Sequence, residues 1–117
     1  MMMGNSPAEV TASVEGECRV IRVSGGLDYD SASLLGAALT ESLQGDTART
    51  VIDLSATDFA DSTFLHVLLS AHRKHQRAQR ELVMAGPFHA VVDRLFEITG
   101  TAGHFTFVDS VSRALRA

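Results

Sequence analysis

We predict an α/β domain for this sequence: a mixed, mostly parallel sheet of four to five strands with an N-terminal antiparallel hairpin, and about four helices. Short runs rich in β-branched residues alternate with longer segments whose apolar residues recur at helical spacing, which is typical of parallel strands joined by crossover helices. A short polar link between the first two runs favours a hairpin. The 117 residues, 45% of them hydrophobic, suffice for the core of one domain and leave no room for a second.

The expected elements follow this patterning along the chain. The first helix is expected to be capped by Asp30 or Ser31 after a turn at residues 25–28, and residues 56–60 are expected to form a loop. Residues 1–8 are expected to be a flexible tail that precedes a domain of residues 9–117. Strands are expected over residues 10–14, 18–24, 49–55, 81–85 and 105–108, and helices over about 31–43, 64–79, 90–99 and 110–115.

Composition and charge exclude several classes of function. A net charge of −4 argues against a dedicated nucleic-acid-binding protein, because neutralising phosphates needs a basic surface. No apolar run approaches the roughly 20 residues of a membrane helix, so we expect no membrane partner. The single cysteine, Cys18, forms no internal disulfide, which favours a cytoplasmic location. The charge is uneven, with ten acidic and three basic residues in 1–61 and four acidic and seven basic residues in 62–117, a polarity that can orient a protein partner.

Asp61, Ser62 and Thr63 stand at the start of the longest expected helix, after a strand and a short connection. All three residue types are good N-caps, and capping alone explains them. The same position also exposes a hydroxyl beyond the carboxyl end of a strand, where α/β sheets place their sites, and the positive end of a helix tolerates a phosphate. Phosphorylation would add about −1.5 to −2 charges beside Asp58 and Asp61, which is a physical switch for a binding surface.

Three segments in order resemble the STAS domains, specifically the bacterial anti-sigma-factor antagonists. Residues 51–73, which read VIDLSATDFADSTFLHVLLSAHR, resemble the signature of that family. Residues 25–28 resemble its Gly-Glu-Leu-Asp turn, and residues 87–100 resemble its later helix, with 105–117 also fitting. The resemblance covers the chain from about Val10 to its end and implies the STAS fold.

This resemblance implies a protein that is a substrate and a binding partner and not itself an enzyme. We expect no cofactor: the family allows a nucleotide site, but the sequence has no Gly-rich phosphate loop of the P-loop type that would establish one. In that family an anti-sigma factor, itself a serine kinase, phosphorylates the serine after the Asp of the signature, which is Ser62 here. Thr63 is then a less favoured acceptor, and Asp28 and Asp61 flank the partner contact. The unphosphorylated antagonist binds the anti-sigma factor and frees a sigma factor, phosphorylation separates the two proteins, and a serine phosphatase restores the complex.

The chain departs from the family at two glycine positions of the signature, which hold Phe64 and His66, and at Gly26, which replaces the usual Glu. We expect Phe64 to lie beside the acceptor, where it either restricts access for a kinase or anchors a partner, because aromatic residues often carry interface energy. His66 is expected on the same contact surface. A STAS domain that serves as a scaffold without a phosphorylation cycle is the alternative function.

Other combinations of residues are weaker. His72 and His75 would need a third ligand to hold a metal, and a solvated basic helix end is the expectation. The basic residues between 73 and 80 have no interleaved aromatic residues that would stack on nucleic-acid bases. A receiver-like phosphoryl-transfer domain would need a cluster of carboxylates for Mg²⁺ after the first strand, and the first two expected strands end in Glu15-Gly16-Glu17 and Ser24-Gly25-Gly26 instead.

Overall fold

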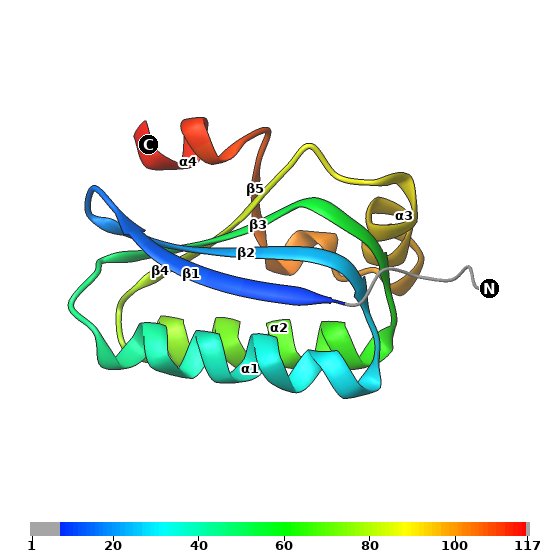
Figure 1. The fold of residues 1–117 in the computed structure, drawn as a ribbon, viewed down its shortest axis with the longest axis horizontal. Coiled ribbons are helices and arrows are strands. Elements are labelled where there is room, and N and C mark those ends of the chain that lie inside the picture. Colours follow the sequence, from blue (N-terminus) through cyan, green and yellow to red (C-terminus); the bar gives the residue numbers. More distant parts are fainter. Residues whose placement is uncertain (1–7, 117) are drawn as a thin grey trace.

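A five-stranded sheet with the strand order β1-β2-β3-β4-β5 forms the centre of the computed structural model, which describes residues 8–116 apart from the side chain of Asp30 (Figure 1). β1 pairs with β2 in an antiparallel hairpin, and the other neighbours are parallel, so the expected mixed sheet is confirmed. All of the tail expected at residues 1–8 except Ala8 lies outside the described residues. The strands are β1 (Glu9–Glu15), β2 (Cys18–Leu27), β3 (Arg49–Ala60), β4 (Glu81–Ala85) and β5 (Thr106–Val108).

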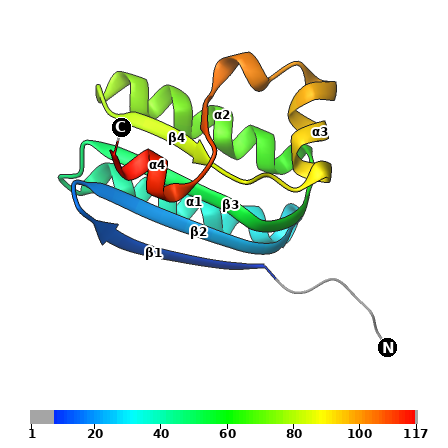
Figure 2. The same ribbon diagram turned by 90° about the horizontal axis from the view of Figure 1, so that it is seen from above.

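Four helices lie around this sheet. α1 and α2 lie side by side on one face, and α4 lies on the opposite face, while α3 lies near the carboxyl ends of the strands (Figures 1 and 2). The main core lies between the sheet and α1 and α2, where Leu35 and Leu68 pack against Ile21 and Ile52. The helices are α1 (Tyr29–Gln44), α2 (Ser62–Arg77), α3 (Ala90–Thr99) and α4 (Val111–Arg116), with a 3₁₀ turn at Ala102–His104.

The first helix begins earlier than expected, and its cap is Asp28 rather than Asp30 or Ser31. A side-chain oxygen of Asp28 accepts a hydrogen bond from the backbone N–H of Ser31 at 3.0 Å. The backbone N–H of Asp28 donates in return to the Ser31 hydroxyl at 2.9 Å. This reciprocal pair is a capping box, so the serine expected as the cap is instead the third residue of the helix.

β2 and β3 both continue through segments expected to be a turn and a loop. β2 runs through residues 25–27, with Gly25 at a φ of +83°, a conformation that favours glycine. β3 runs through residues 56–60 and takes up extra residues opposite β2 at two register shifts, before Ala56 and at Asp58. Such bulges break the strict alternation of side chains, which is why the pattern of the sequence does not predict these strand ends.

A buried hydroxyl supports the first of these bulges. Thr57 is fully buried, and its Oγ1 donates a hydrogen bond to the backbone carbonyl of Val23 at 2.8 Å. Val23 lies in β2 at the first register shift, between Arg22 and Ser24. A buried carbonyl without a partner is costly, so this side-chain bond stabilises the irregular pairing.

A second buried polar group, His75, corrects the expectation of a solvated basic helix end. Arg73, Lys74 and Arg77 are exposed as expected, whereas His75 is only 1% exposed. Its Nδ1–H donates to the carbonyl of Ala71 at 2.7 Å, and its Nε2 accepts from the Thr50 hydroxyl at 3.0 Å. His75 therefore fastens the end of α2 to the start of β3.

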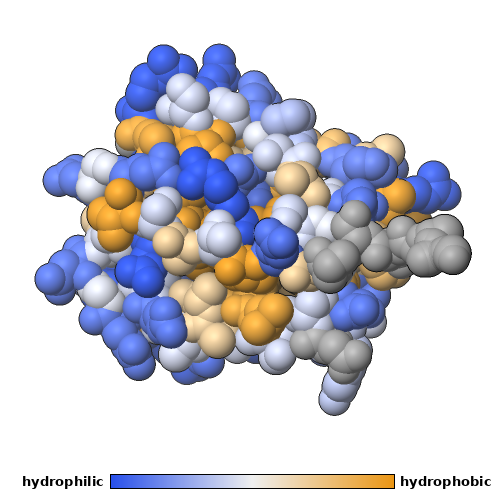
Figure 3. Space-filling model, viewed as in Figure 1, coloured by the Kyte–Doolittle hydropathy of each residue, from blue (hydrophilic) through white to orange (hydrophobic). Residues whose placement is uncertain are grey.

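The face that carries β1 and α1 is mostly hydrophilic, with small hydrophobic patches between charged and polar side chains (Figure 3). Val14 on β1 and Leu34 on α1 are exposed large apolar residues. Scattered apolar residues of this kind are normal on protein surfaces, so they do not mark a site.

We predict that Thr57→Val lowers the free energy of unfolding by about 1–3 kcal/mol, because the carbonyl of Val23 loses its buried donor. Urea denaturation measures the change. Thr11→Val is the matched control, since Thr11 is exposed on β1 and the same substitution there should change stability by less than about 0.5 kcal/mol. Equal effects of the two substitutions would contradict the role given to Thr57.

We also predict that His75 makes the protein less stable as the pH falls below about 6.5. Burial lowers the pKa of His75, as do the charges of Arg80 and His72 to a smaller extent, while the bond to the Ala71 carbonyl opposes the shift. The unfolded chain therefore binds a proton at His75 at a higher pH than the native protein does. Stability is lost as the pH falls from the pKa of His75 in the unfolded chain toward its lower pKa in the native protein. Urea denaturation at pH 7.5 and 5.5 should show a smaller loss of stability in His75→Gln than in the wild type. His104→Gln, at an exposed position, should keep the wild-type loss, and an unchanged loss in His75→Gln would refute the prediction.

Candidate functional site

Asp28 and Asp61 lie side by side at the carboxyl edge of the sheet. Each follows directly on the last residue of its strand, and these last residues, Leu27 and Ala60, are register partners in the parallel pair β2 and β3. The backbone N–H of Asp61 donates to the carbonyl of Leu27 at 3.3 Å, which joins the two connections. The starts of α1 and α2 are therefore neighbours in space, and both are capped by an aspartate.

Ser62 is the first residue of α2, and its side chain is exposed. Asp61 is the cap, because its Oδ1 accepts from the backbone N–H of Thr63 at 2.9 Å. Among the described residues no side chain or carbonyl holds the Ser62 hydroxyl, so capping does not use it. The structure thus presents a hydroxyl to solvent whose presence the helix start does not explain, while the half-buried Thr63 is less accessible.

Phe64 is not on this surface, which corrects the expectation that its side chain restricts a kinase or anchors a partner. The side chain is 0% exposed and belongs to the main core. Its ring meets that of Phe96 on α3 edge to face, with 6.1 Å between the ring centroids. The reason is the helical period, which turns position 64 toward the core when position 62 faces solvent. His66, expected on the same surface as Ser62, is exposed one turn further along α2.

Two exposed aromatic residues flank the site and were not predicted. Tyr29, directly after Asp28, is 76% exposed, and Phe59, two residues before Asp61, is 43% exposed. The bulge at Asp58 turns both Asp58 and Phe59 outward. A Cβ atom at Gly26 would lie 3.6 Å from the Cβ of Phe59, so the missing side chain of Gly26 leaves Phe59 uncovered. The signal in the sequence was the position of each aromatic residue within two residues of a capping aspartate.

Carboxylates surround this part of the surface. Asp28 and Asp58 are exposed, and Asp61, the cap of α2, is half-buried. The positive end of the α2 dipole and its capped backbone N–H groups lie against this acidic edge. A doubly charged group added at Ser62 would therefore meet both an attractive helix end and repulsive neighbouring carboxylates.

Within residues 8–116 there is no group of three histidine, cysteine or acidic side chains able to hold a metal ion. His72 and His75 do not form half of such a site. The ring of His72 lies edge to face against Phe105 at 5.6 Å, and His75 is held by the bonds described above. No helix in the described part of the chain is both long and apolar enough to span a membrane.

A family model described as Mlab, STAS domain, matches residues 10–109. The chain belongs to the STAS domain family. The resemblance read from residues 51–73 is thus confirmed, and the five-stranded sheet with its N-terminal hairpin and four helices is the STAS fold.

Solved structures share this STAS fold along nearly their whole length. An anti-sigma factor antagonist from Mycobacterium paratuberculosis superposes with a TM-score of 0.84 at 23% sequence identity, over 94% of this chain and 92% of that chain. The anti-sigma factor antagonist SpoIIAA in its unphosphorylated form gives a TM-score of 0.75 at 19% identity, over 94% and 95% of the two chains. The Bacillus cell fate determinant SpoIIAA in the phosphorylated form gives 0.69 at 17% identity, over 94% and 98%. At these identities the likeness establishes the fold.

Proposed function

We propose that this STAS domain is an anti-sigma-factor antagonist that regulates transcription by switching partners. Unphosphorylated, it binds an anti-sigma factor that is a serine kinase, and this binding frees a sigma factor. Phosphorylation of Ser62 by that kinase releases the antagonist, and a serine phosphatase reverses the modification. The domain itself is a substrate and not an enzyme, and it works in the cytoplasm, where transcription takes place.

The exposed Ser62 hydroxyl is the observation that carries this proposal. A kinase needs a hydroxyl that it can approach and that no structural bond holds, and Ser62 meets both conditions. Phe64, the residue whose bulk would have blocked the approach, has its side chain in the core. The fold supports the proposal as well, since it is shared with SpoIIAA, a protein described in phosphorylated and unphosphorylated forms.

The charges around Ser62 explain how phosphorylation would break a complex. A phosphate adds about −1.5 to −2 charges, and here it would stand beside Asp61, with Asp28 and Asp58 on the same edge. A partner that fits the unmodified surface would then bury an excess of negative charge or leave it unpaired. Either outcome is strongly unfavourable at an interface.

The exposed aromatic residues supply the apolar part of the proposed contact. Tyr29 directly follows Asp28, Phe59 lies two residues before Asp61, and both side chains are exposed at the edge that carries Ser62. Tyr is enriched among the few residues that dominate interface energies, and aromatic residues are enriched at interfaces in general. We therefore place the partner contact at Asp28, Asp61, Ser62, Thr63 and His66, with Tyr29 and Phe59 as its apolar anchors.

We predict that the anti-sigma factor kinase, recovered by pull-down with the wild-type protein and incubated with it and ATP, phosphorylates Ser62. Mass spectrometry locates the phosphate. Ser62→Ala should abolish the modification, whereas Thr63→Ala should keep it. Phosphate on Thr63 alone, or on neither residue, would contradict the proposal.

Binding of the same kinase separates the proposed switch from the scaffold alternative. Ser62→Asp should weaken the affinity about tenfold or more, which corresponds to about 1.4 kcal/mol, whereas Ser62→Ala should retain it. Calorimetry with the two variants measures the difference. Equal affinities would instead favour a STAS domain that binds its partner without a phosphorylation cycle.

We further predict that Tyr29→Ala and Phe59→Ala each weaken partner binding about tenfold or more, because each removes a large apolar side chain from the proposed contact. Both side chains are exposed, so thermal unfolding should show little change in either variant. Ile98→Ala is the control, since Ile98 is 69% exposed at the far end of α3. A loss of affinity in Ile98→Ala as large as in the other two variants would move the contact away from the Ser62 edge.

A further inference from the structure

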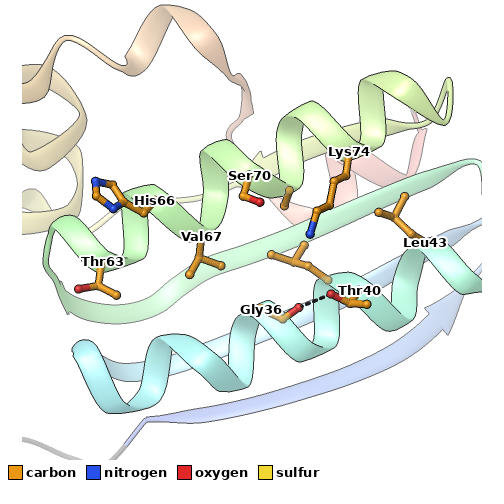
Figure 4. Close-up of a pocket in the computed structure, with 10 residues that line it drawn as sticks. Gly36, Thr40, Leu43, Thr63, His66, Val67, Ser70 and Lys74 are labelled. Carbon is orange, nitrogen blue, oxygen red and sulfur yellow. Dashed lines mark hydrogen bonds between the residues drawn. The ribbon is translucent and has the colours of Figure 1, made fainter.

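A cleft with a volume of about 360 Å³ runs between α1 and α2 (Figure 4). The two helices are parallel neighbours on the same face of the sheet, and the cleft follows the seam between them. Its size lies within the range of about 300–1,000 Å³ typical of small-molecule sites. The cleft is lined by Gly36, Leu39, Thr40, Leu43, Thr63, His66, Val67, Ser70, Ala71 and Lys74.

A single ammonium group gives this cleft its charge. Lys74, the one lysine of the sequence, extends from α2 toward α1 across one end of the cleft (Figure 4). No aspartate or glutamate is among the residues that line it, and no carboxylate of residues 8–116 forms an ion pair with Lys74. An anion bound beside Lys74 would therefore form an ion pair with its ammonium group without displacing a carboxylate of the protein.

The exposed surface of the cleft is mainly apolar, although Ser70, His66 and Thr63 also line it beyond Lys74. Leu39 and Leu43 from α1 face Val67 and Ala71 from α2. The hydroxyl of Thr40 is already used, because it donates to the carbonyl of Gly36 at 3.0 Å. A mainly apolar surface of this kind favours a ligand with a hydrocarbon chain.

The absence of a side chain at Gly36 keeps the middle of the cleft open. A Cβ atom placed there would meet no atom within 4 Å other than the Cγ1 of Val67 at 3.8 Å. Glycine in the middle of a helix is unfavourable by about 1 kcal/mol relative to alanine, and φ at this position is not in the left-handed region. Space, not backbone conformation, is therefore what this glycine provides.

We propose that the cleft binds an amphiphilic organic anion, with its anionic head at Lys74 and its aliphatic chain along the seam toward Thr63. From Lys74 to Thr63 the axis of α2 covers about 16 Å at 1.5 Å per residue, which suits an extended chain better than a compact anion. His66 lies at the rim, with its ring turned away from α1 (Figure 4). Ser62 is not among the residues that line the cleft, although Thr63 and His66 belong to both the cleft and the proposed partner contact. The proposal itself does not rest on phosphorylation or on a partner.

Decanoate is the probe for this site, used below its micelle-forming concentration with the full-length protein. Two-dimensional ¹H–¹⁵N NMR should show saturable shifts of amides in α1 and α2 that face the cleft. Acetate has the head without the chain, and decyltrimethylammonium has the chain with the opposite charge. Neither should give saturable shifts of the same amides. No response to decanoate, or an equal response to decyltrimethylammonium, would overturn the proposal.

Variants test the two features on which the site depends. Lys74→Gln should weaken decanoate binding about tenfold by removing the charge, since a hydrogen bond to a charged group is lost. Gly36→Leu should abolish binding by filling the cleft. Ala37→Leu, at the exposed neighbouring position on α1, is the matched control and should bind decanoate like the wild type. Wild-type binding in Gly36→Leu would place the ligand elsewhere and overturn the proposal.

Discussion

The pairing of β2 with β3 is the constraint on which the rest of the structure depends. β3 has 12 residues and β2 has 10, and the strands nevertheless end together at Leu27 and Ala60. This is possible because β3 accommodates extra residues in two bulges, the first of them supported by the hydroxyl of Thr57. Without these two bulges, α2 would begin about two residues, or about 7 Å, beyond the start of α1. The two capping aspartates would then no longer be neighbours, and the acidic edge around Ser62 would not exist.

The change from an acidic to a basic part of the sequence is also seen along α2, which has an aspartate at its start and basic residues in its last turn. Asp61 caps its first turn, which is worth about 1 kcal/mol, and Lys74 and Arg77 lie in its last turn, where positive charge is favourable. His75, in the same last turn, adds no charge near neutral pH because burial keeps it neutral. A phosphate at Ser62 would stand at the favourable end of this helix. The start of α2 can therefore accommodate a phosphate at Ser62. Together with the surrounding carboxylates, that phosphate would make the surface more negative toward a partner.

The regular parts of the fold could be predicted from the sequence, and the irregular parts could not. Residues 49–55 were predicted as a strand because a compact β-branched run is typical of a buried one. Residues 56–60 were wrongly predicted as a loop, because bulges mix polar and apolar residues in a way that resembles one. The place of Ser62 could be predicted, since a helix start after a strand exposes a hydroxyl. The burial of His75 could not, because its partners Ala71 and Thr50 come together only when α2 packs on the sheet.

The burial of Phe64 has a consequence for the exposed surface beside it. Successive residues of a helix point about 100° apart, so Ser62 faces solvent, Thr63 faces the cleft beside α1, and Phe64 enters the core. The contact between Phe64 and Phe96 fastens the first turn of α2 to α3, where a glycine at position 64 would offer no side chain to hold. Ordering a flexible segment on binding lowers affinity, and a turn that is already fixed avoids much of that loss. Phe64 therefore supports the proposed partner surface from the core, by holding Ser62 and Asp61 in place.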